Sequence, residues 1–165
     1  MHKLEGRMLN VTNMRGEDFA LFSKMVSHPI VMNQNLGRTF TEEEATYFFQ
    51  QVVLSENVRD GFGYFKVSLS ETGAFIGIAA ISENETYQAP EIEYMLLPEY
   101  WNKGYGTALV QWLLERIRSV NGAASAVAIT DPNNTYSRKI LLSLGFRSEK
   151  TYRNPDGDLA ELFRK

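Results

Sequence analysis

Residues 98–107 constrain the fold of this chain more than any other segment. They read PEYWNKGYGT and lie between a strand-like stretch and the strongest helical pattern of the sequence, residues 105–120. In that pattern apolar residues recur at every fourth position, at Leu109, Leu113 and Ile117, so they share one face of a helix. A strand that runs through a short loop into a long amphipathic helix is typical of a layered α/β fold.

The same loop has the features of an anion site. The first turn of a helix leaves N–H groups without partners and carries about half a positive charge. Gly104 and Gly106 remove side chains that would keep an anion away, and Lys103 adds a positive charge at the rim. These features predict a cradle for phosphate or pyrophosphate. A loop that merely needs positive φ is the alternative interpretation of the two glycines.

Two other nucleotide-binding patterns fit this loop less well. The Rossmann fingerprint needs a third glycine in register, which the segment 107–109 does not supply. The P-loop needs a lysine directly after its last glycine, whereas Lys103 precedes Gly104.

The rest of the chain alternates between strand-like and helix-like patterns. Strands are predicted at 7–11, 63–69, 74–81, 91–97, 125–130, 146–152 and 158–163, and helices at 17–26, after Thr41, at 105–120 and at 135–144. This order predicts one α/β domain, residues 1–165, in which a mixed sheet of about seven strands is flanked on both faces by about four helices.

Local signals refine this outline. Thr41 and Glu44 fit a capping box at the start of the second helix. Gly77 lies inside the strand 74–81 and predicts a bulge or a close backbone approach. The polar stretch 82–90 is expected to be a loop, and Ser27-His28-Pro29 is expected to end the first helix.

Composition excludes several classes of site. The chain has no cysteine and only two histidines, so a disulfide framework, a cysteine nucleophile and a zinc or iron–sulfur centre are not expected. The net charge of −3 lacks the excess of lysine and arginine that is typical of proteins that bind nucleic acid. No apolar run approaches the roughly 20 residues of a membrane span, and the N-terminus lacks the apolar core of a signal peptide. A cytoplasmic protein with no membrane partner is therefore expected.

The segment 91–107 resembles the acetyl-CoA-binding motif of the GNAT superfamily of N-acetyltransferases, which has Gln/Arg-x-x-Gly-x-Gly/Ala at the start of its longest helix. A second similarity lies downstream, in Asn134 to Ser137 and in the Leu-Gly-Phe of 144–146. Three early landmarks also fit the family: a first strand, a helix that contains Asp18, and then Ser27-His28-Pro29. With these, the resemblance covers nearly the whole chain. It is closest to the branch that includes ribosomal-protein N-terminal acetyltransferases. It implies a GNAT-like fold and direct transfer of the acetyl group of acetyl-CoA to a primary amine in a ternary complex.

The resemblance also implies which residues hold acetyl-CoA. In this family the strand before the glycine loop splays from its neighbour, and its backbone binds the pantetheine and the thioester. Main-chain groups of Met95 and Leu97 are expected to do so here, and Asn134 is expected to reach the pantetheine arm. The full set of implied cofactor-binding residues is Met95, Leu96, Leu97, Asn102, Lys103, Gly104, Tyr105, Gly106, Thr107, Asn134 and Ser137.

Two positions depart from the family pattern. Trp101 replaces the usual Gln or Arg, which removes one side-chain contact to phosphate. Leu141 stands where many relatives have the tyrosine that protonates the CoA thiolate. This second departure leaves an alternative open, in which the chain is a non-catalytic CoA-binding or ligand-sensing module. Against that alternative, a thiolate with a pKa near 8.5 can leave without an acid.

The candidate catalytic base is Glu93, with Glu91 second. An alkyl amine with a pKa near 10.4 is only about 0.1% neutral at pH 7.4, so it needs a base. Both glutamates point to one face of the strand, where mutual repulsion raises the pKa of one of them.

The acceptor itself stays open between protein N-termini, polyamines, aminoglycosides and small amino acids. Aromatic residues that are candidates to line its pocket are Phe40, Tyr47, Tyr64, Tyr87 and Tyr94. Exposed apolar strands at the C-terminus are candidates to pair two subunits in a homodimer.

Overall fold

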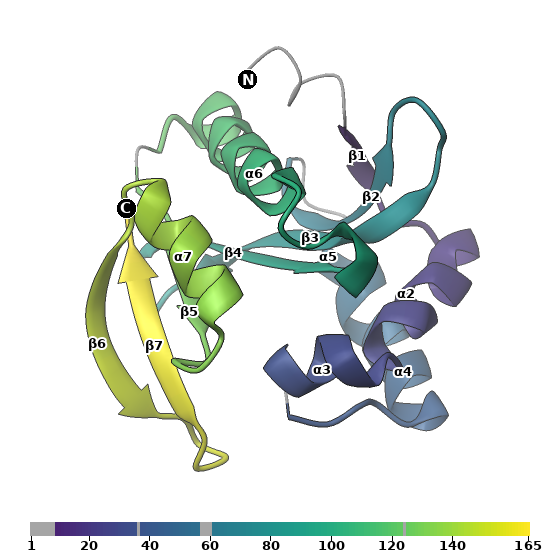
Figure 1. Cartoon of the computed structure of the whole chain (residues 1–165), viewed down its shortest axis with the longest axis horizontal. Coiled ribbons are helices and arrows are strands. Elements are labelled where there is room, and N and C mark those ends of the chain that lie inside the picture. The colour runs from purple at the N-terminus through teal and green to yellow at the C-terminus, as the bar shows by residue number, and fades with distance from the viewer. Residues whose placement is uncertain (1–8, 36, 57–60, 124) are drawn as a thin grey trace.

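Seven strands form one mixed sheet in the order β1-β2-β3-β4-β5-β7-β6, as predicted in number (Figure 1). The structure is a computed structural model that describes residues 9–35, 37–56, 61–123 and 125–165. The strands are β1 Leu9–Asn13, β2 Gly63–Leu69, β3 Phe75–Asn84, β4 Ala89–Leu96, β5 Val127–Thr130, β6 Arg147–Arg153 and β7 Leu159–Arg164. All neighbours are antiparallel except β4 and β5, which are parallel. Residues 7 and 8 of the first predicted strand lie outside the described residues.

The helical elements agree with the prediction in order but are more numerous. They are η1 Gly16–Asp18, α2 Phe19–Val26, α3 Pro29–Asn35, α4 Glu42–Phe48, η2 Phe49–Val53, α5 Leu54–Glu56, η3 Pro98–Tyr100, α6 Tyr105–Asn121 and α7 Thr135–Ser143. The helix α3 was not predicted. Pro29 is its first residue, a position where proline starts a helix as readily as it stops one, because the N–H it lacks has no intrahelical partner there.

Helices cover both faces of the sheet, as predicted (Figure 1). On one face, α6 and α7 pack against a core that includes Phe65, Ile92 and Leu109. On the other face, α2, α3 and α4 enclose a second core around Phe22, Phe49 and Ile78. Successive side chains of a strand point to opposite faces of the sheet, so neighbouring residues of one strand pack into different cores.

The helix after Thr41 begins with the predicted capping box. The Glu44 N–H donates to the Thr41 hydroxyl at 3.1 Å, and the Thr41 N–H donates to the Glu44 carboxylate at 2.9 Å. The helix then continues as a π-helical segment, η2, and a last turn, α5. Phe49 and Val53 stay buried through this change, so the predicted apolar stripe still faces the core.

The hairpin of β3 and β4 is longer than predicted. The stretch 82–90, expected to be a loop, mostly belongs to the strands, and residues 85–88 alone connect them. The prediction was wrong because polar residues next to the turn of a hairpin still pair through their backbones. At the other end, the register of β2 and β3 shifts beside Gly77. A Cβ at Gly77 would lie 2.2 Å from the Met95 carbonyl oxygen, so both the bulge and the close approach are present.

The C-terminal strands do not present the apolar surface expected of them. The exposed residues of β6 are polar, with Arg147, Glu149 and Lys150 among them, whereas Leu162 and Phe163 of β7 are buried. The order of strands explains this. Because β7 lies between β5 and β6, it is not an edge strand, and Leu162 and Phe163 are buried in the cores on either face of the sheet. Leu159 at the start of β7 is the exposed large apolar residue of these two strands, and formation of a homodimer stays a prediction.

Candidate active site

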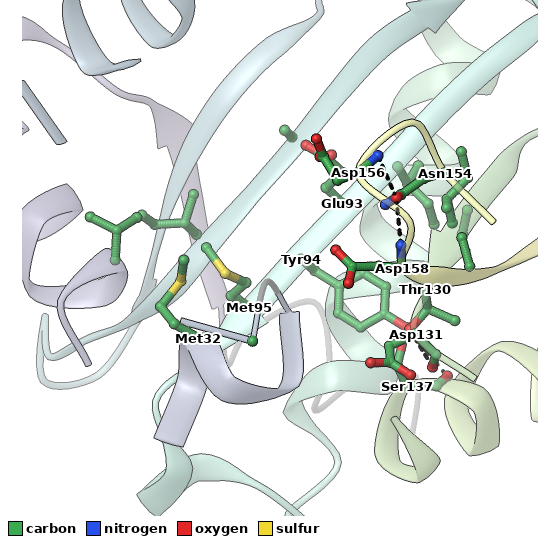
Figure 2. Close-up of a pocket in the computed structure, with 18 of the residues that line it drawn as sticks. Met32, Glu93, Tyr94, Met95, Thr130, Asp131, Ser137, Asn154, Asp156 and Asp158 are labelled. Atoms are coloured by element: carbon green, nitrogen blue, oxygen red, sulfur yellow. Dashed lines mark hydrogen bonds between the residues drawn. The ribbon is translucent and has the colours of Figure 1, made fainter. Parts of the chain in front are cut away.

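The parallel strands β4 and β5 share a single residue pair, Glu91 with Val127, and then diverge. A cavity of about 550 Å³ lies at this opening, within the size range of small-molecule sites. It is lined by Tyr94, whose side chain lies on the α6 and α7 face, and also by Glu93 and Met95, which lie on the other face (Figure 2). The cavity therefore passes through the sheet.

Glu93 lines this cavity beside Tyr64. Tyr64 of β2, Ala80 of β3 and Glu93 of β4 are paired neighbours across three strands. The small side chain of Ala80 leaves room for the Tyr64 hydroxyl to come within hydrogen-bonding reach of the Glu93 carboxylate. Two strands far apart in sequence thus position one carboxylate.

The pKa of Glu93 is raised to about 7, first by burial and then by the charge of Glu91, while the Tyr64 hydroxyl lowers it. The side chain is accessible to water because it stands in a cavity, although protein atoms surround it on most sides. These two facts are compatible, since a concave site admits water molecules and still removes much of the bulk solvent that stabilises a charge. The rise agrees in direction with the predicted repulsion, but burial is the larger cause.

Glu91 precedes Glu93 by two residues on β4 and is not among the residues that line the cavity. It accepts a hydrogen bond from the Asn84 side chain at 2.9 Å. Burial raises its pKa, and the Asn84 bond lowers it. The geometry thus favours Glu93 over Glu91 for contact with a ligand, and Glu91 acts on Glu93 through its charge.

The start of α6 has the geometry expected of an anion cradle. Gly104 has a φ of 87° and Asn102 a φ of 58°, both left-handed. Lys103 and Gly104 are exposed. Gly104, the N-cap residue, has no side chain to cap this helix, so the first-turn N–H groups of Tyr105 and Thr107 are placed to meet an outside acceptor.

Gly106 has a second reason to be glycine. A Cβ there would lie 2.5 Å from the Tyr136 hydroxyl and 2.6 Å from the Ile140 Cδ1, both on α7. A hydrogen bond from the Gly106 backbone lowers the pKa of Tyr136, although burial raises it more. Gly106 is therefore required by the close contact of α6 and α7 as well as by any anion.

Trp101 ties the loop to its surroundings. Its indole N–H donates to the Leu96 carbonyl at 2.9 Å, and its ring stacks on Tyr136 with centroids 5.6 Å apart. The departure from the family's Gln or Arg thus has a structural role here, which connects β4, the loop and α7.

The main-chain groups of Met95 and Leu97 face β3 and not the opening towards β5. The Leu97 N–H donates to the Ile76 carbonyl at 2.8 Å, and the Leu97 carbonyl accepts from Tyr100 at 2.9 Å. Because hydrogen-bonding direction alternates along a strand, Met95 also faces β3. By the same alternation the main-chain groups of Tyr94 and Leu96 face the opening, and the cofactor contacts expected of Met95 and Leu97 stay a prediction.

Asn134 and Ser137 lie at the start of α7. The Asn134 side chain accepts from the Ser137 N–H at 3.0 Å and so caps the helix. The Ser137 hydroxyl lies 2.8 Å from the Tyr94 hydroxyl, and both residues line the cavity. Leu141, one turn further on, is fully buried, so the usual acid position offers no proton donor.

The cavity also has residues that were not singled out from the sequence. Asp131 follows β5, and Asp156 and Asp158 lie in the turn between β6 and β7. Only the sheet order brings these segments to the end of β4. Of the aromatic candidates, Phe40, Tyr64 and Tyr94 line the cavity. Tyr47 is instead 69% exposed, and Tyr87 packs in a separate cluster.

Two searches of the described residues bear on other classes of site. None of the helices there is long and apolar enough to cross a membrane. No group of three or more histidine, cysteine, aspartate or glutamate side chains in the same ranges is arranged to hold a metal ion.

Comparison with known proteins gives a consistent result. The profile of the acetyltransferase (GNAT) domain family matches residues 9–147. The uncharacterized N-acetyltransferase YnaD of Bacillus subtilis (strain 168) is 26% identical over 149 residues, which is 90% of this chain and 84% of YnaD.

Solved structures have the same fold. The ribosomal-protein-S5-alanine acetyltransferase of Vibrio fischeri superposes with a TM-score of 0.77 at 17% identity, over 96% of this chain and 92% of that one. An aminoglycoside acetyltransferase in complex with coenzyme A superposes with a TM-score of 0.77 at 19% identity, over 95% of this chain and 94% of that one.

Proposed function

Because the chain belongs to the GNAT acetyltransferase family, we propose that it transfers the acetyl group of acetyl-CoA to a primary amine within a ternary complex. The observation that carries this proposal is the cavity that crosses the sheet between β4 and β5. It gives access to Glu93 from one face of the sheet and to Tyr94 and Ser137 from the other. A donor and an acceptor can therefore meet from opposite faces.

The residues at the opening fit acetyl-CoA. The uncapped first turn of α6, with exposed Lys103 and Gly104, suits the pyrophosphate. In this proposal the main chain of Tyr94 and the N–H of Leu96 would contact the pantetheine, because the Leu96 carbonyl already accepts from Trp101, and Ser137 would lie opposite. Asn102, Tyr105, Gly106 and Thr107 complete the loop, and Asn134 holds the start of α7. When bound, acetyl-CoA supplies an activated acyl group.

Glu93 would act as the base, directly or through a water molecule. With a pKa of about 7 it is half ionised near neutral pH, which suits a general base. The amine nitrogen gives a proton to the carboxylate and forms a bond to the acetyl carbon. The carbon–sulfur bond breaks, and CoA leaves as a thiolate that takes a proton from solvent or from a hydroxyl in the cavity. Glu91 would tune the pKa of Glu93.

The test is the variant Glu93→Gln, which keeps the size of the side chain. We expect turnover, measured as thiol release with an amine, to fall by about 100-fold or more. The affinity for CoA, measured by calorimetry, should stay within twofold, because Glu93 lies away from the α6 loop. Glu71→Gln, an exposed site on the β2–β3 turn, is the matched control. An undiminished rate in Glu93→Gln would remove Glu93 from the mechanism.

One observation favours a second candidate, a non-catalytic CoA-binding module. The residue at the usual acid position, Leu141, is fully buried in the core. Such a module would bind CoA but release no thiol with any amine. The same assay, run over a panel of amines, therefore separates the two functions.

We also propose that the chain is related to the branch of ribosomal-protein N-terminal acetyltransferases. Its support is the similar fold of one such enzyme together with the motif resemblance. Cytoplasmic location and homodimer formation are likewise proposals, and size-exclusion chromatography with light scattering tests the second.

A further inference from the structure

The cavity has an acidic side that the proposed reaction does not use. Besides Glu93 of β4, it is lined by Asp131, which follows β5, and by Asp156 and Asp158 of the β6–β7 turn (Figure 2). Within the described residues, none of these three aspartates forms an ion pair. Arg153, which also lines the cavity, donates to the Gly157 carbonyl at 2.8 Å. Arg153 keeps its positive charge there, but four carboxylates against one guanidinium still leave the lining with an excess of negative charge.

The turn itself does not need the carboxylates of Asp156 and Asp158. Aspartates are common in turns because their side chains cap backbone N–H groups. Here Asn154 has that role, since its side-chain oxygen accepts from the N–H groups of Asp156 at 3.0 Å and Asp158 at 2.9 Å (Figure 2). The backbone bond from Gly157 to Asn154 closes the turn at 2.9 Å. The two carboxylates are thus left for an interaction outside the turn.

Asp131 is partly committed to its own loop. Its carboxylate accepts from the Asn133 N–H at 2.8 Å, which uses one of its oxygens. It still adds negative charge to the cavity wall from the β5 side. The charge at this end of the cavity therefore comes from two separate segments, Asp131 and the β6–β7 turn.

The opposite side of the cavity is apolar. Met32 and Met95 lie on the far side of Tyr94 from the three aspartates (Figure 2), and Phe40 and Phe48 line the same region. Flexible methionine side chains and aromatic rings suit an aliphatic chain, which they contact without specific hydrogen bonds. A ligand that fits both sides has methylene groups as well as positive charge.

The chemistry of the acceptor makes the charge informative. The amine that attacks must be neutral, so it cannot be the group that balances Asp156 and Asp158. A cleft lined by one sign of charge attracts the opposite sign and raises its local concentration. The carboxylates therefore favour an acceptor with a second amine that stays protonated at neutral pH.

We propose that the acceptor is an aliphatic polyamine, one amine of which is acetylated near Glu93 while another ammonium group binds Asp156 and Asp158. This inference rests on the proposed function and names the substrate class of the same cavity. In it, Asp156 and Asp158 determine specificity and take no part in the bond changes.

The test compares two amines that differ in one charge. 1,4-Diaminobutane and n-butylamine share a four-carbon chain, and only the first carries a second ammonium group. With the full chain and acetyl-CoA, we expect kcat/KM, measured by thiol release, to favour the diamine by tenfold or more. In Asp156→Asn/Asp158→Asn the ratio of the two kcat/KM values should fall about tenfold, towards one, which lies within the range of up to about fivefold for each ion pair that is not fully buried.

Glu71→Gln is the control for a lost surface charge, and it should keep the wild-type ratio. Equal use of the two amines, a preference for a peptide N-terminus, or a ratio unchanged in the double variant would overturn the inference. If no amine gives thiol, the proposed transfer fails, and binding then decides whether Asp156 and Asp158 recognise an ammonium group of a polyamine. In that case spermidine should bind the CoA-loaded wild type in calorimetry, and the double variant should bind it at least tenfold more weakly; equal affinities would overturn the inference.

Discussion

At the scale of single residues, the environment of Glu93 matters most. Its pKa of about 7 results from burial and from the charge of Glu91, which raise it, and from the Tyr64 hydroxyl, which lowers it. Ala80 makes the last contact possible because it is small and lies between the two residues in the paired strands. A carboxylate with this pKa is a stronger base than an exposed one and is still ionised in part at neutral pH.

Tyr64→Phe tests this balance. Removing the hydroxyl takes away the contact that lowers the pKa of Glu93, so that pKa should rise further. Since the base acts as a carboxylate, the rate increases with pH through this pKa. In the variant the rising limb of the pH–rate profile, near pH 7 in the wild type, should move to higher pH. The loss of rate should be several-fold at pH 6.5 and small at pH 9.

The control is Tyr47→Phe, because Tyr47 is 69% exposed on α4 and does not line the cavity. Its profile should coincide with that of the wild type. A Tyr64→Phe profile that falls by one factor at every pH would show that Tyr64 supports the site mechanically and does not set the pKa of Glu93.

At the scale of elements, the contact of α6 with α7 links packing to the cofactor site. Gly104 and Gly106 look alike in sequence but differ in the structure. Gly104 has a φ of 87° and no atom within 4 Å of a Cβ placed there, whereas Gly106 is closed in by α7. The first is therefore free to contact a ligand, and the second serves the helix contact.

Gly104→Ala and Gly106→Ala should therefore fail in different ways. Alanine at 104 should cost about 1 kcal/mol for its positive φ and weaken CoA binding at the loop. Alanine at 106 should push α7 away and cost about 1–3 kcal/mol. Urea denaturation and CoA calorimetry measure the two effects.

Adding Tyr136→Phe to Gly106→Ala removes the nearest atom, so it should recover part of the lost stability. Equal losses of stability at 104 and 106, with no recovery in the double variant, would contradict the distinct role of Gly106. Gly16→Ala, with no atom near its Cβ and no positive φ, is a neutral reference.

What could be predicted at this scale was local. The strand Gly63–Leu69 and the capping box at Thr41 match the prediction, because alternation and capping depend on neighbouring residues. The helix α3 was missed because Pro29 can end one helix and begin the next. The contacts of Tyr64 with Glu93, and of Asp156 and Asp158 with the cavity, depend on strand register and strand order. No pattern within one segment carries that information.

At the scale of the whole molecule, the sheet has little backbone pairing between β4 and β5, where a single residue pair joins the two strands. Beyond that pair, β5 and β7 are joined to the rest through the shared core, where Ala128 and Phe163 lie in the same buried cluster as Ile92 and Leu109. On that side, the buried Glu161 of β7 binds Arg138 of α7 at 2.7 Å and accepts from the Ser148 hydroxyl of β6 at 2.6 Å. One carboxylate thus connects three elements beside the opening, and Arg138 serves this contact.

This carboxylate should make stability depend on pH. The hydrogen bond from Arg138 holds the pKa of Glu161 below its ordinary value, against the opposing effect of burial. A carboxyl whose pKa is lower in the folded state stabilises the protein above its unfolded pKa, near 4.3. That stabilisation is lost as the pH falls from there through the folded pKa. The free energy of unfolding should therefore fall between about pH 5 and pH 3, measured by urea denaturation with tryptophan fluorescence.

Glu161→Gln separates this contribution from the other carboxylates. At pH 7 the variant should be less stable by roughly 1–3 kcal/mol, because Arg138 loses a charged partner and the site stays buried. Its stability should also fall less steeply with acid, since one titrating group is gone. Glu149→Gln, which removes an exposed partner of Arg164 in the same hairpin, should cost less than about 1 kcal/mol. Parallel stability curves for wild type and Glu161→Gln would mean that Glu161 titrates alike in the folded and unfolded states, so that the bond from Arg138 does not lower its pKa.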